Sequence, residues 1–471
     1  MSSYTNRYKE LLKDTFLIAL GNIGSKMIVF FLVPLYTYCL TPDEYGISDL
    51  VFTISQLAIP FFSLVIFDAV IRFAILYKDQ PENVLRAGIR VWVIGTVFTI
   101  IATPLFGLYK PVNEWRWYIT GYISFSILLS IELNYLKATN RNLAFSIICI
   151  FQTFILACSN IILLVYHNMG IRGYLISYVT SSGIAAAVAF FVGKIYVDLK
   201  KSQYDKVLCR QMIAYSTPLI LNNLSWWAIH SSDKLMLESM IGEYALGLYS
   251  VAARIPSLVS VFVTIFQQAW GISSSKEMDS ENDSGFYSNV FTIYSTVAFL
   301  GGIVLCIIIK PFMDIYIRSE AYGDVWRYVP LLIASAVFSA LAAYCGSMYG
   351  ALKRSINNMN STFAAAVINV VVNYVAILRY GIWGAMIGTI VAYTVLAFIR
   401  IIDIKRYVNI EIEWRKLIIN SVLMICQAVA VSLCSVIIGF SVSICCLIVF
   451  VVTNRGELYR IIAKLKTRRT H

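Results

Sequence analysis

Long apolar stretches recur along almost the whole chain, and they constrain the fold more than any other feature. From residue 15 to residue 453, runs of about 17–25 mostly apolar residues alternate with short polar connections, and an α-helix needs a run of that length to cross a bilayer. Of the 471 residues, 59% are hydrophobic and only 14% are charged, whereas soluble chains carry about 25% charged residues. The sequence therefore predicts an all-α polytopic membrane protein, and it excludes soluble enzymes and nucleic-acid-binding proteins.

Turn and charge signals divide the chain into fourteen predicted transmembrane helices. Their ranges are 15–40, 47–76, 87–108, 117–136, 143–166, 174–197, 211–235, 246–272, 288–309, 328–352, 359–378, 382–404, 417–437 and 439–453. The turn between the last two is placed at Gly439 to Ser443. No connection exceeds about 17 residues, which leaves no room for a catalytic domain outside the membrane.

The basic residues are distributed unevenly between the two sides of the predicted membrane. The N-terminus and every second connection together carry 27 Lys and Arg residues, a count that includes Arg400, and the other connections carry 7. Basic residues are enriched in cytoplasmic loops. Both termini are therefore predicted to be cytoplasmic, which requires an even number of spans.

Short matches suggest that the chain contains an internal repeat. A shift of 201 residues aligns Gly46 with Gly247 and Asn22 with Asn223, and duplicated halves are common in transporters. Six predicted spans separate the two copies, so both have the same orientation. The predicted domains are an N-terminal six-helix lobe (1–197), a second six-helix lobe (211–404), two additional transmembrane helices (417–453) and a basic cytoplasmic tail (454–471).

Polar residues follow one face of several predicted spans, at spacings of three and four. The stripe residues are Asn22, Asp49, Thr53, Gln56, Asn223, Ser250, Ser257 and Gln268. Residues at these spacings share a helix face, and a polar face in a membrane must turn toward other helices or water. The first, second, seventh and eighth spans are therefore predicted to line a cleft between the two lobes.

Four basic residues belong to neither of the counts given above and lie inside predicted spans, where a charge is costly. They are Lys26, Arg72, Lys234 and Arg254. One interpretation is a set of cations for an anion, most plausibly phosphate, because Arg and Lys bind phosphate oxygens strongly. The alternative is structural: Arg72 pairs with Asp68 one turn earlier, and Lys234 pairs with Asp233 or extends to the membrane interface.

The carboxylates inside the spans are candidates for coupling to an ion. Asp68, Glu132 and Asp233 could carry a proton or Na⁺, although such residues more often act as counter-ions. His230 follows the Lys234 stripe, and Trp226, Trp227 and Trp270 could stack on sugar faces or lie at the membrane interface. No metal-ligand spacing, nucleophile–base pair or phosphate-binding glycine loop is found, so no metal, cofactor or catalytic residue is predicted.

Several of these segments match a known family. The relevant runs are 20–26 (LGNIGSK), 33–37 (VPLYT), 44–46 (EYG), 233–237 (DKLML), 247–250 (GLYS) and 253–256 (ARIP). They resemble the polysaccharide-transporter (Wzx-type) flippases of the multidrug/oligosaccharidyl-lipid/polysaccharide exporter superfamily. The resemblance covers nearly the whole chain, including its length and its layout of six, six and two helices. It specifies the superfamily but not the glycan.

The resemblance implies a two-lobed transporter in the bacterial cytoplasmic membrane. Such a protein flips an undecaprenyl-diphosphate-linked oligosaccharide repeat unit to the outer leaflet by alternating access, for surface polysaccharides such as capsule or O-antigen. Related lipid II flippases hold the diphosphate with cations on the first, second and eighth helices, where this chain has Lys26, Arg72 and Arg254. A lysine on the first helix departs from the arginine expected there. Implied partners are the lipid-linked glycan, a glycan polymerase and other assembly proteins.

Three other functions remain open at this point. A small-molecule or drug exporter of the same superfamily would be expected to line its cavity with carboxylates if it carried organic cations, and the four buried basic residues argue against it. A membrane glycan polymerase or acyltransferase would need a catalytic constellation, and the short loops contain none. A non-transporting scaffold in a glycan assembly complex is also compatible with the sequence.

Overall fold

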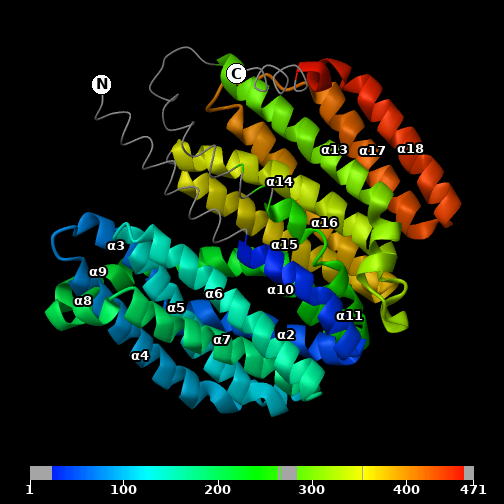
Figure 1. The fold of residues 1–471 in the computed structure, drawn as a ribbon. Helices are drawn as coiled ribbons and strands as arrows, with labels where there is room; N and C mark the ends of the chain where they lie inside the picture. Colours follow the sequence, from blue (N-terminus) through cyan, green and yellow to red (C-terminus); the bar gives the residue numbers. More distant parts are fainter. Residues whose placement is uncertain (1–23, 262, 264–265, 267–283, 353, 461–471) are drawn as a thin grey trace, which may run out of the picture. The chain divides into compact units, whose positions relative to one another are not determined.

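The computed structural model describes residues 24–261, 263, 266, 284–352 and 354–460, and its regular elements there are helices (Figure 1). In this part of the chain, eleven helices are long and apolar enough to cross a membrane, and Gly24–Cys39 forms a shorter apolar helix. The prediction of an all-α multi-pass membrane protein is confirmed. The seventh predicted span, 211–235, is not a single helix: it covers the end of the helix Lys206–Ser216 and most of the helix Leu219–Met240, and the latter is not among the eleven.

Compact packing divides the chain into two units. Unit 1 comprises residues 1–238 and 242–247, and unit 2 comprises residues 239–241 and 248–471. Unit 1 contains the helix Gly24–Cys39 and the following elements: α2 (Pro42–Ser63), α3 (Ile66–Leu76), α4 (Pro81–Phe106), η1 (Lys110–Trp115), α5 (Arg116–Ala138), α6 (Asn142–Asn160), η2 (Ile161–Tyr166), α7 (Gly170–Val192), α8 (Ile195–Lys201), α9 (Lys206–Ser216) and most of α10 (Leu219–Met240). The boundary falls within α11 (Glu243–Ala252).

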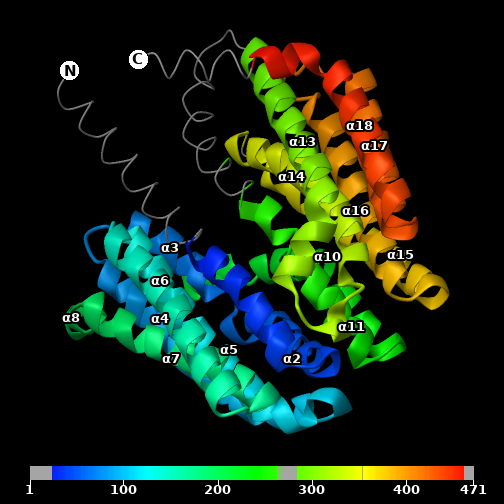
Figure 2. The ribbon, with the colours of Figure 1, turned by 45° about the vertical axis from the view of Figure 1, so that its right-hand side comes forward.

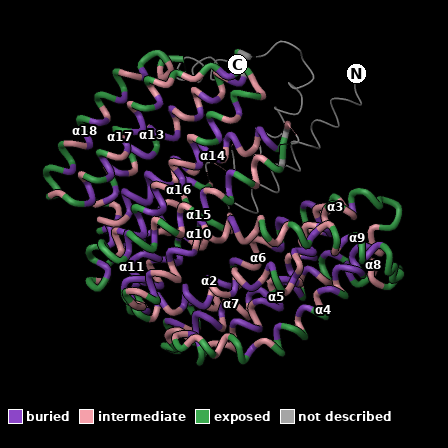
Figure 3. Tube along the Cα trace, turned by 180° about the vertical axis from the view of Figure 1, so that it is seen from behind, coloured by how far each residue is buried: buried purple, intermediate pink, exposed green. Residues whose placement is uncertain are grey.

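The core of unit 1 lies where α5, α6 and α7 pack together. Leu136 of α5, Phe145 and Ile148 of α6, and Ala185 and Ala189 of α7 belong to one buried cluster. The small alanines bring α7 close to its neighbours, which favours dense helix packing in a membrane. By contrast, α4 is one of the least buried spans, with only 22% of its most apolar part buried, and buried, half-buried and exposed residues alternate along it (Figure 3).

Two glycines that the proposed repeat aligns lie at a reciprocal contact in unit 1. A Cβ added to Gly46 of α2 would lie 2.2 Å from the carbonyl oxygen of Glu243, and a Cβ added to Gly247 of α11 would lie 1.9 Å from that of Pro42. The shift of 201 residues relates Gly46 to Gly247 and also Pro42 to Glu243. Reciprocal contacts of this kind are what a two-fold relation between copies produces. Only residues without a Cβ fit at these two positions.

Unit 2 contains α13 (Ser284–Tyr316), η3 (Glu320–Tyr322), η4 (Val325–Arg327), α14 (Val329–Ala351), α15 (Ser355–Tyr380), α16 (Ile382–Ile404), α17 (Trp414–Leu433) and α18 (Val436–Thr453). Helix α14 is its most buried span, and it packs against α13, α15, α16 and α17. Helices α13, α17 and α18 lie side by side (Figure 2).

Several predicted span boundaries differ from the structure, and three of the differences have a clear local cause. The second predicted span is two helices, because Leu64 and Val65 adopt left-handed backbone conformations between α2 and α3. The eighth is interrupted by a turn at residues 253–256, after which residues 257–261 are helical again. The last turn lies at Cys434 and Ser435, not at Gly439. Gly439 lies inside α18, where a Cβ would approach the Cα of Val431 on α17 to 3.1 Å.

The two packing units divide the chain at a different place from the predicted lobes. The second predicted lobe begins at residue 211, whereas α9 and most of α10 belong to unit 1. Helix α9 packs against α3 and α4, and α10 is joined to α2 by polar contacts described below. The lobes were inferred from the repeat and not from packing, and they stay a prediction.

Candidate functional site

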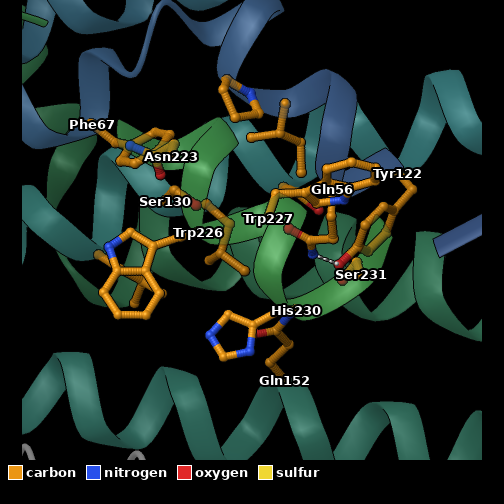
Figure 4. A pocket seen from close by; sticks show the side chains of 15 residues that line it. Gln56, Phe67, Tyr122, Ser130, Gln152, Asn223, Trp226, Trp227, His230 and Ser231 are labelled. Atoms are coloured by element: carbon orange, nitrogen blue, oxygen red, sulfur yellow. Dashed lines mark hydrogen bonds between the residues drawn. The ribbon is translucent and has the colours of Figure 1, made fainter. Parts of the chain in front are cut away.

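Unit 1 encloses a cavity of about 480 Å³. Helices α2, α5, α6 and α10 form its walls, with one residue, Phe67, from α3 (Figure 4). Its polar and aromatic lining residues are Gln56, Tyr122, Ser126, Ser130, Gln152, Asn223, Trp226, Trp227, His230 and Ser231. The apolar ones are Ile59, Pro60, Phe67, Leu129 and Leu133. The volume lies in the range of small-molecule sites, which is about 300–1,000 Å³.

The chemistry of the cavity is polar but uncharged. Among the described residues that line it, none is Asp, Glu, Lys or Arg. The amide of Gln56 donates to the hydroxyl of Tyr122 over a long 3.5 Å, and the amide nitrogen of Asn223 donates to the carbonyl of Leu219 at 3.0 Å. Each carboxamide provides donors and an acceptor. The lining therefore offers many hydrogen-bonding groups to an uncharged ligand.

Two tryptophans give α10 an aromatic face in this cavity. The indole nitrogen of Trp227 donates to the backbone carbonyl of Thr53 at 3.1 Å, which fastens α10 to α2. The indole of Trp226 stacks on the imidazole of His230, with ring centroids 5.6 Å apart and planes 15° from parallel. The two indole rings are thereby held in place, so less side-chain entropy is lost when a ligand packs against them.

A buried ion pair links α10 to α2 one turn beyond the cavity. The ammonium of Lys234 lies 2.7 Å from the carboxylate of Asp49, and the exposed fractions of the two side chains are 15% and 1%. The carboxylate of Asp233 accepts a hydrogen bond from the backbone nitrogen of Lys234 at 2.9 Å. Two predicted site residues, Lys234 and Asp49, thus neutralise each other. A buried charge needs such a partner.

The other predicted cations lie elsewhere. Lys26 is exposed on the helix Gly24–Cys39. The guanidinium of Arg72 on α3 is exposed and lies 4.4 Å from the ring centroid of Tyr215 on α9. Arg254 is half-buried in the turn that follows α11. The described cavity of unit 1 is lined by none of the four predicted cations.

The predicted polar stripe is only partly brought together. Gln56 and Asn223 line the cavity, while Thr53 and Asp49 hold α10. Ser250 is buried in α11, and Ser257 is exposed and donates to the carbonyl of Arg254. Asn22, Gln268 and Trp270 lie outside the described residues.

The three predicted ion-coupling carboxylates occupy different environments. Glu132 of α5 is 1% exposed, and within the described part of the chain no hydrogen-bond donor reaches its Oε2 atom. Asp68 of α3 is half-buried and interacts electrostatically with Lys137 of α5. Asp233 is buried beside the Lys234–Asp49 pair.

Sequence reasoning missed the α5 and α6 side of the cavity. Tyr122, Ser126 and Ser130 recur every four residues on α5, and Gln152 faces them from α6. The same spacing identified the other polar stripes, so this signal was available.

Sequence reasoning also assigned Arg400 to a cytoplasmic connection. The structure places Arg400 inside α16 with 1% exposure, so it must be removed from the charge count.

Comparisons with known proteins agree with the architecture. A family model described as a polysaccharide biosynthesis protein matches residues 11–271, and a second model, MatE, matches residues 218–375. An uncharacterized membrane protein of Haemophilus influenzae is 22% identical over 263 residues, which are 55% of this chain and 64% of that protein. The probable low-salt glycan biosynthesis flippase Agl15 of Haloferax volcanii is 21% identical over 264 residues, 53% of each chain. This chain thus spans less than two thirds of the length of these relatives.

A solved structure has the same fold. The lipid II flippase MurJ, in an inward closed conformation, matches with a TM-score of 0.68 and 13% identity, covering 94% of this chain and 100% of that chain. The fold is therefore shared, and the family resemblance inferred from the sequence motifs is confirmed. Because the first family model covers more than half of its 471 residues, this chain belongs to the polysaccharide biosynthesis protein family.

Proposed function

We propose that this protein is a flippase that moves an undecaprenyl-diphosphate-linked oligosaccharide from the cytoplasmic to the outer leaflet by alternating access. The observation that carries the proposal is the polar cavity inside a unit of membrane-spanning helices. Polar groups within a membrane are costly, and they persist where polar cargo or water must be accommodated. Membership of a polysaccharide biosynthesis family supports a glycan as that cargo.

The diphosphate needs positive charge, which the cavity lining does not supply. We propose that Lys26, Arg72 and Arg254 contact it during the transport cycle. Lys234 is paired with Asp49 in the described conformation and would have to leave that carboxylate before it could bind a phosphate. No cofactor is proposed.

Coupling to H⁺ or Na⁺ is part of the proposal. Glu132 is the strongest candidate, because it is 1% exposed and no hydrogen-bond donor in the described part of the chain reaches its Oε2 atom, which a proton or an ion could therefore occupy. Asp68 and Asp233 are further candidates: Asp68 interacts electrostatically with Lys137, and Asp233 accepts a hydrogen bond from the backbone nitrogen of Lys234. We place the protein in the bacterial cytoplasmic membrane with both termini in the cytoplasm, beside a glycan polymerase and other assembly proteins.

A small-molecule exporter is the second candidate, favoured by the match of the MatE model to residues 218–375. An exporter of organic cations would be expected to place a carboxylate in its binding cavity. Among the described residues, the cavity of unit 1 contains none. We also propose transport and not catalysis, so that a membrane polymerase or acyltransferase is the least supported function.

The test is genetic complementation in the native host. We expect deletion of the gene to abolish the surface polymer while its lipid-linked precursor accumulates in the cytoplasmic leaflet. The variants Lys26→Ala and Arg254→Ala should fail to restore the polymer, even when the variant proteins are present in the membrane at normal levels. The matched control Arg379→Ala, an exposed residue of α15, should restore it. A deletion strain that keeps its polymer would contradict the glycan assignment and favour drug export.

A further inference from the structure

We propose that the cavity of unit 1 binds an uncharged sugar of the lipid-linked headgroup, at a site separate from the cations that take the diphosphate. This inference rests on the proposed flippase function, and it assigns a ligand class to one particular cavity. It follows from the charge, the hydrogen-bonding groups and the aromatic surfaces of the lining residues.

Charge is the first argument. A desolvated anion in this cavity would find no Lys or Arg among the described lining residues, and a desolvated cation would find no Asp or Glu. The ion pair one turn away offers no net charge, because Lys234 and Asp49 neutralise each other at 2.7 Å. Burying an unpaired charge is far more costly than burying a hydrogen-bonded neutral group. His230 is the one lining residue among those described that could carry a positive charge near neutral pH, and it already stacks on Trp226, so the lining favours an uncharged ligand.

The carboxamides point to a ligand with many hydroxyl groups. Gln56, Gln152 and Asn223 come from three different helices and surround the same space. Each carboxamide presents donors beside an acceptor, which matches the adjacent hydroxyl groups of a sugar ring. The contact from Gln56 to Tyr122 is 3.5 Å long and weak, so a ligand hydroxyl can replace it at small cost. An aliphatic chain in this cavity would instead leave these groups unsatisfied.

The aromatic surfaces complete the argument. A sugar ring has apolar C–H faces as well as hydroxyl edges, and an indole offers a large flat apolar surface. The Trp226 ring stacks on His230 (Figure 4), and the indole nitrogen of Trp227 donates to the backbone carbonyl of Thr53. Amides on α2 and α6 and indoles on α10 thus surround the cavity from different walls. This combination suits a sugar, which needs edge hydrogen bonds and face stacking at the same time.

The test compares two lipid probes that differ only in a sugar. The full-length protein is placed in lipid nanodiscs, and its affinity is measured for undecaprenyl diphosphate and for undecaprenyl diphosphate carrying one N-acetylglucosamine. We expect the wild-type protein to bind the glycosylated lipid more tightly. Trp226→Ala and Gln152→Leu, on two different helices, should each weaken binding of the glycosylated lipid about five- to tenfold and leave the bare lipid unchanged.

Trp117→Ala is the matched control, because Trp117 lies on α5, is 61% exposed and is not among the cavity residues. It should leave both affinities unchanged. The proposal is overturned if the wild-type protein binds both lipids equally, or if the cavity variants, with melting temperatures close to wild type, affect both lipids equally or neither. Saturable binding of tetraphenylphosphonium that Gln152→Leu abolishes would also overturn it, in favour of an organic cation. If the wild-type protein binds neither lipid, the flippase function itself fails, and that outcome is distinct from the others.

Discussion

The cavity of unit 1 and a cluster around Arg400 in unit 2 both place polar side chains among transmembrane helices, but they satisfy them differently. Arg400 of α16 donates to the side chains of Ser361, Thr362 and Asn358 on α15 at 2.6–3.0 Å, and to the carbonyl of Ala342 on α14 at 2.9 Å. In this Arg400 cluster, Arg400 is 1% exposed, and each of its three guanidinium nitrogens donates a hydrogen bond within unit 2. In the cavity of unit 1, by contrast, Gln56 makes a long contact with Tyr122 and Asn223 donates to the backbone carbonyl of Leu219, beside an open volume.

This contrast distinguishes polar residues that hold a membrane protein together from polar residues that bind. A saturated cluster has no capacity left for a ligand, and removing one member leaves buried partners unsatisfied. An unsaturated cavity contributes little to folding but can exchange its contacts for those of a ligand. Variants in the Arg400 cluster should therefore mainly reduce stability, whereas variants in the cavity should mainly reduce transport.

The largest effect is expected at the centre of the Arg400 cluster. Arg400→Met should lower the free energy of unfolding by about 4 kcal/mol, because several buried acceptors on α14 and α15 lose their donor together. Thermal unfolding in detergent would measure this loss. Arg379→Met, at an exposed position of α15, is the control and should change stability little. A stable Arg400→Met protein would show that the cluster does not hold α14, α15 and α16 together.

The Lys234–Asp49 pair should behave as a structural contact of intermediate strength. Lys234→Met leaves the buried Asp49 carboxylate without its cation, and we expect a loss of about 3 kcal/mol. The double variant Lys234→Met/Asp49→Asn should recover at least half of this loss, because position 49 then carries no unpaired charge. Chemical unfolding of the three proteins tests the coupling. Equal destabilisation in the single and double variants would argue against a direct pair.

A smaller effect is expected where Trp227 fastens α10 to α2. Trp227→Phe keeps an aromatic ring but removes the donor to the Thr53 carbonyl, which should cost about 1 kcal/mol. The same change at the exposed Trp117 should cost less, and the two melting temperatures can be compared directly. If both changes had the same effect, the hydrogen bond would not contribute to holding α10.

The smallest effect on stability is expected in the open part of the cavity. Gln152→Leu and Ser130→Ala should change the free energy of unfolding by less than about 0.5 kcal/mol, because neither side chain is fully buried. Both variants should nevertheless reduce surface polymer in the complementation assay. A marked loss of stability in either variant would show that these cavity residues stabilise the fold as the Arg400 cluster does. The contrast between the two regions would then be wrong.

Much of the architecture could be predicted from the sequence because it depends on local properties. Apolar run length identifies membrane-crossing helices, and polar spacing of three and four residues identifies helix faces that must be buried. The repeat aligns Gly46 with Gly247 from the sequence alone, and the structure places both glycines at the contact between α2 and α11. The same spacing rule would have found Tyr122, Ser126 and Ser130 if it had been applied to α5.

Helix ends and charge partners depended on tertiary structure. Gly439 suggested a turn, yet it allows α18 to approach α17. The sequence offered Asp233 as a partner for Lys234 and Asp68 as a partner for Arg72, whereas the structure brings Asp49 to Lys234 and Tyr215 to Arg72.

The sequence by itself therefore determined the class of protein, most of its membrane-crossing helices and part of the surface that turns inward. Only the tertiary structure decided which inward-facing groups meet, because a span is recognised from about 20 consecutive residues while its contacts come from helices far away in the chain. Whether a polar side chain is saturated, as at Arg400, or left open to a ligand, as at Gln152, is a property of that packing.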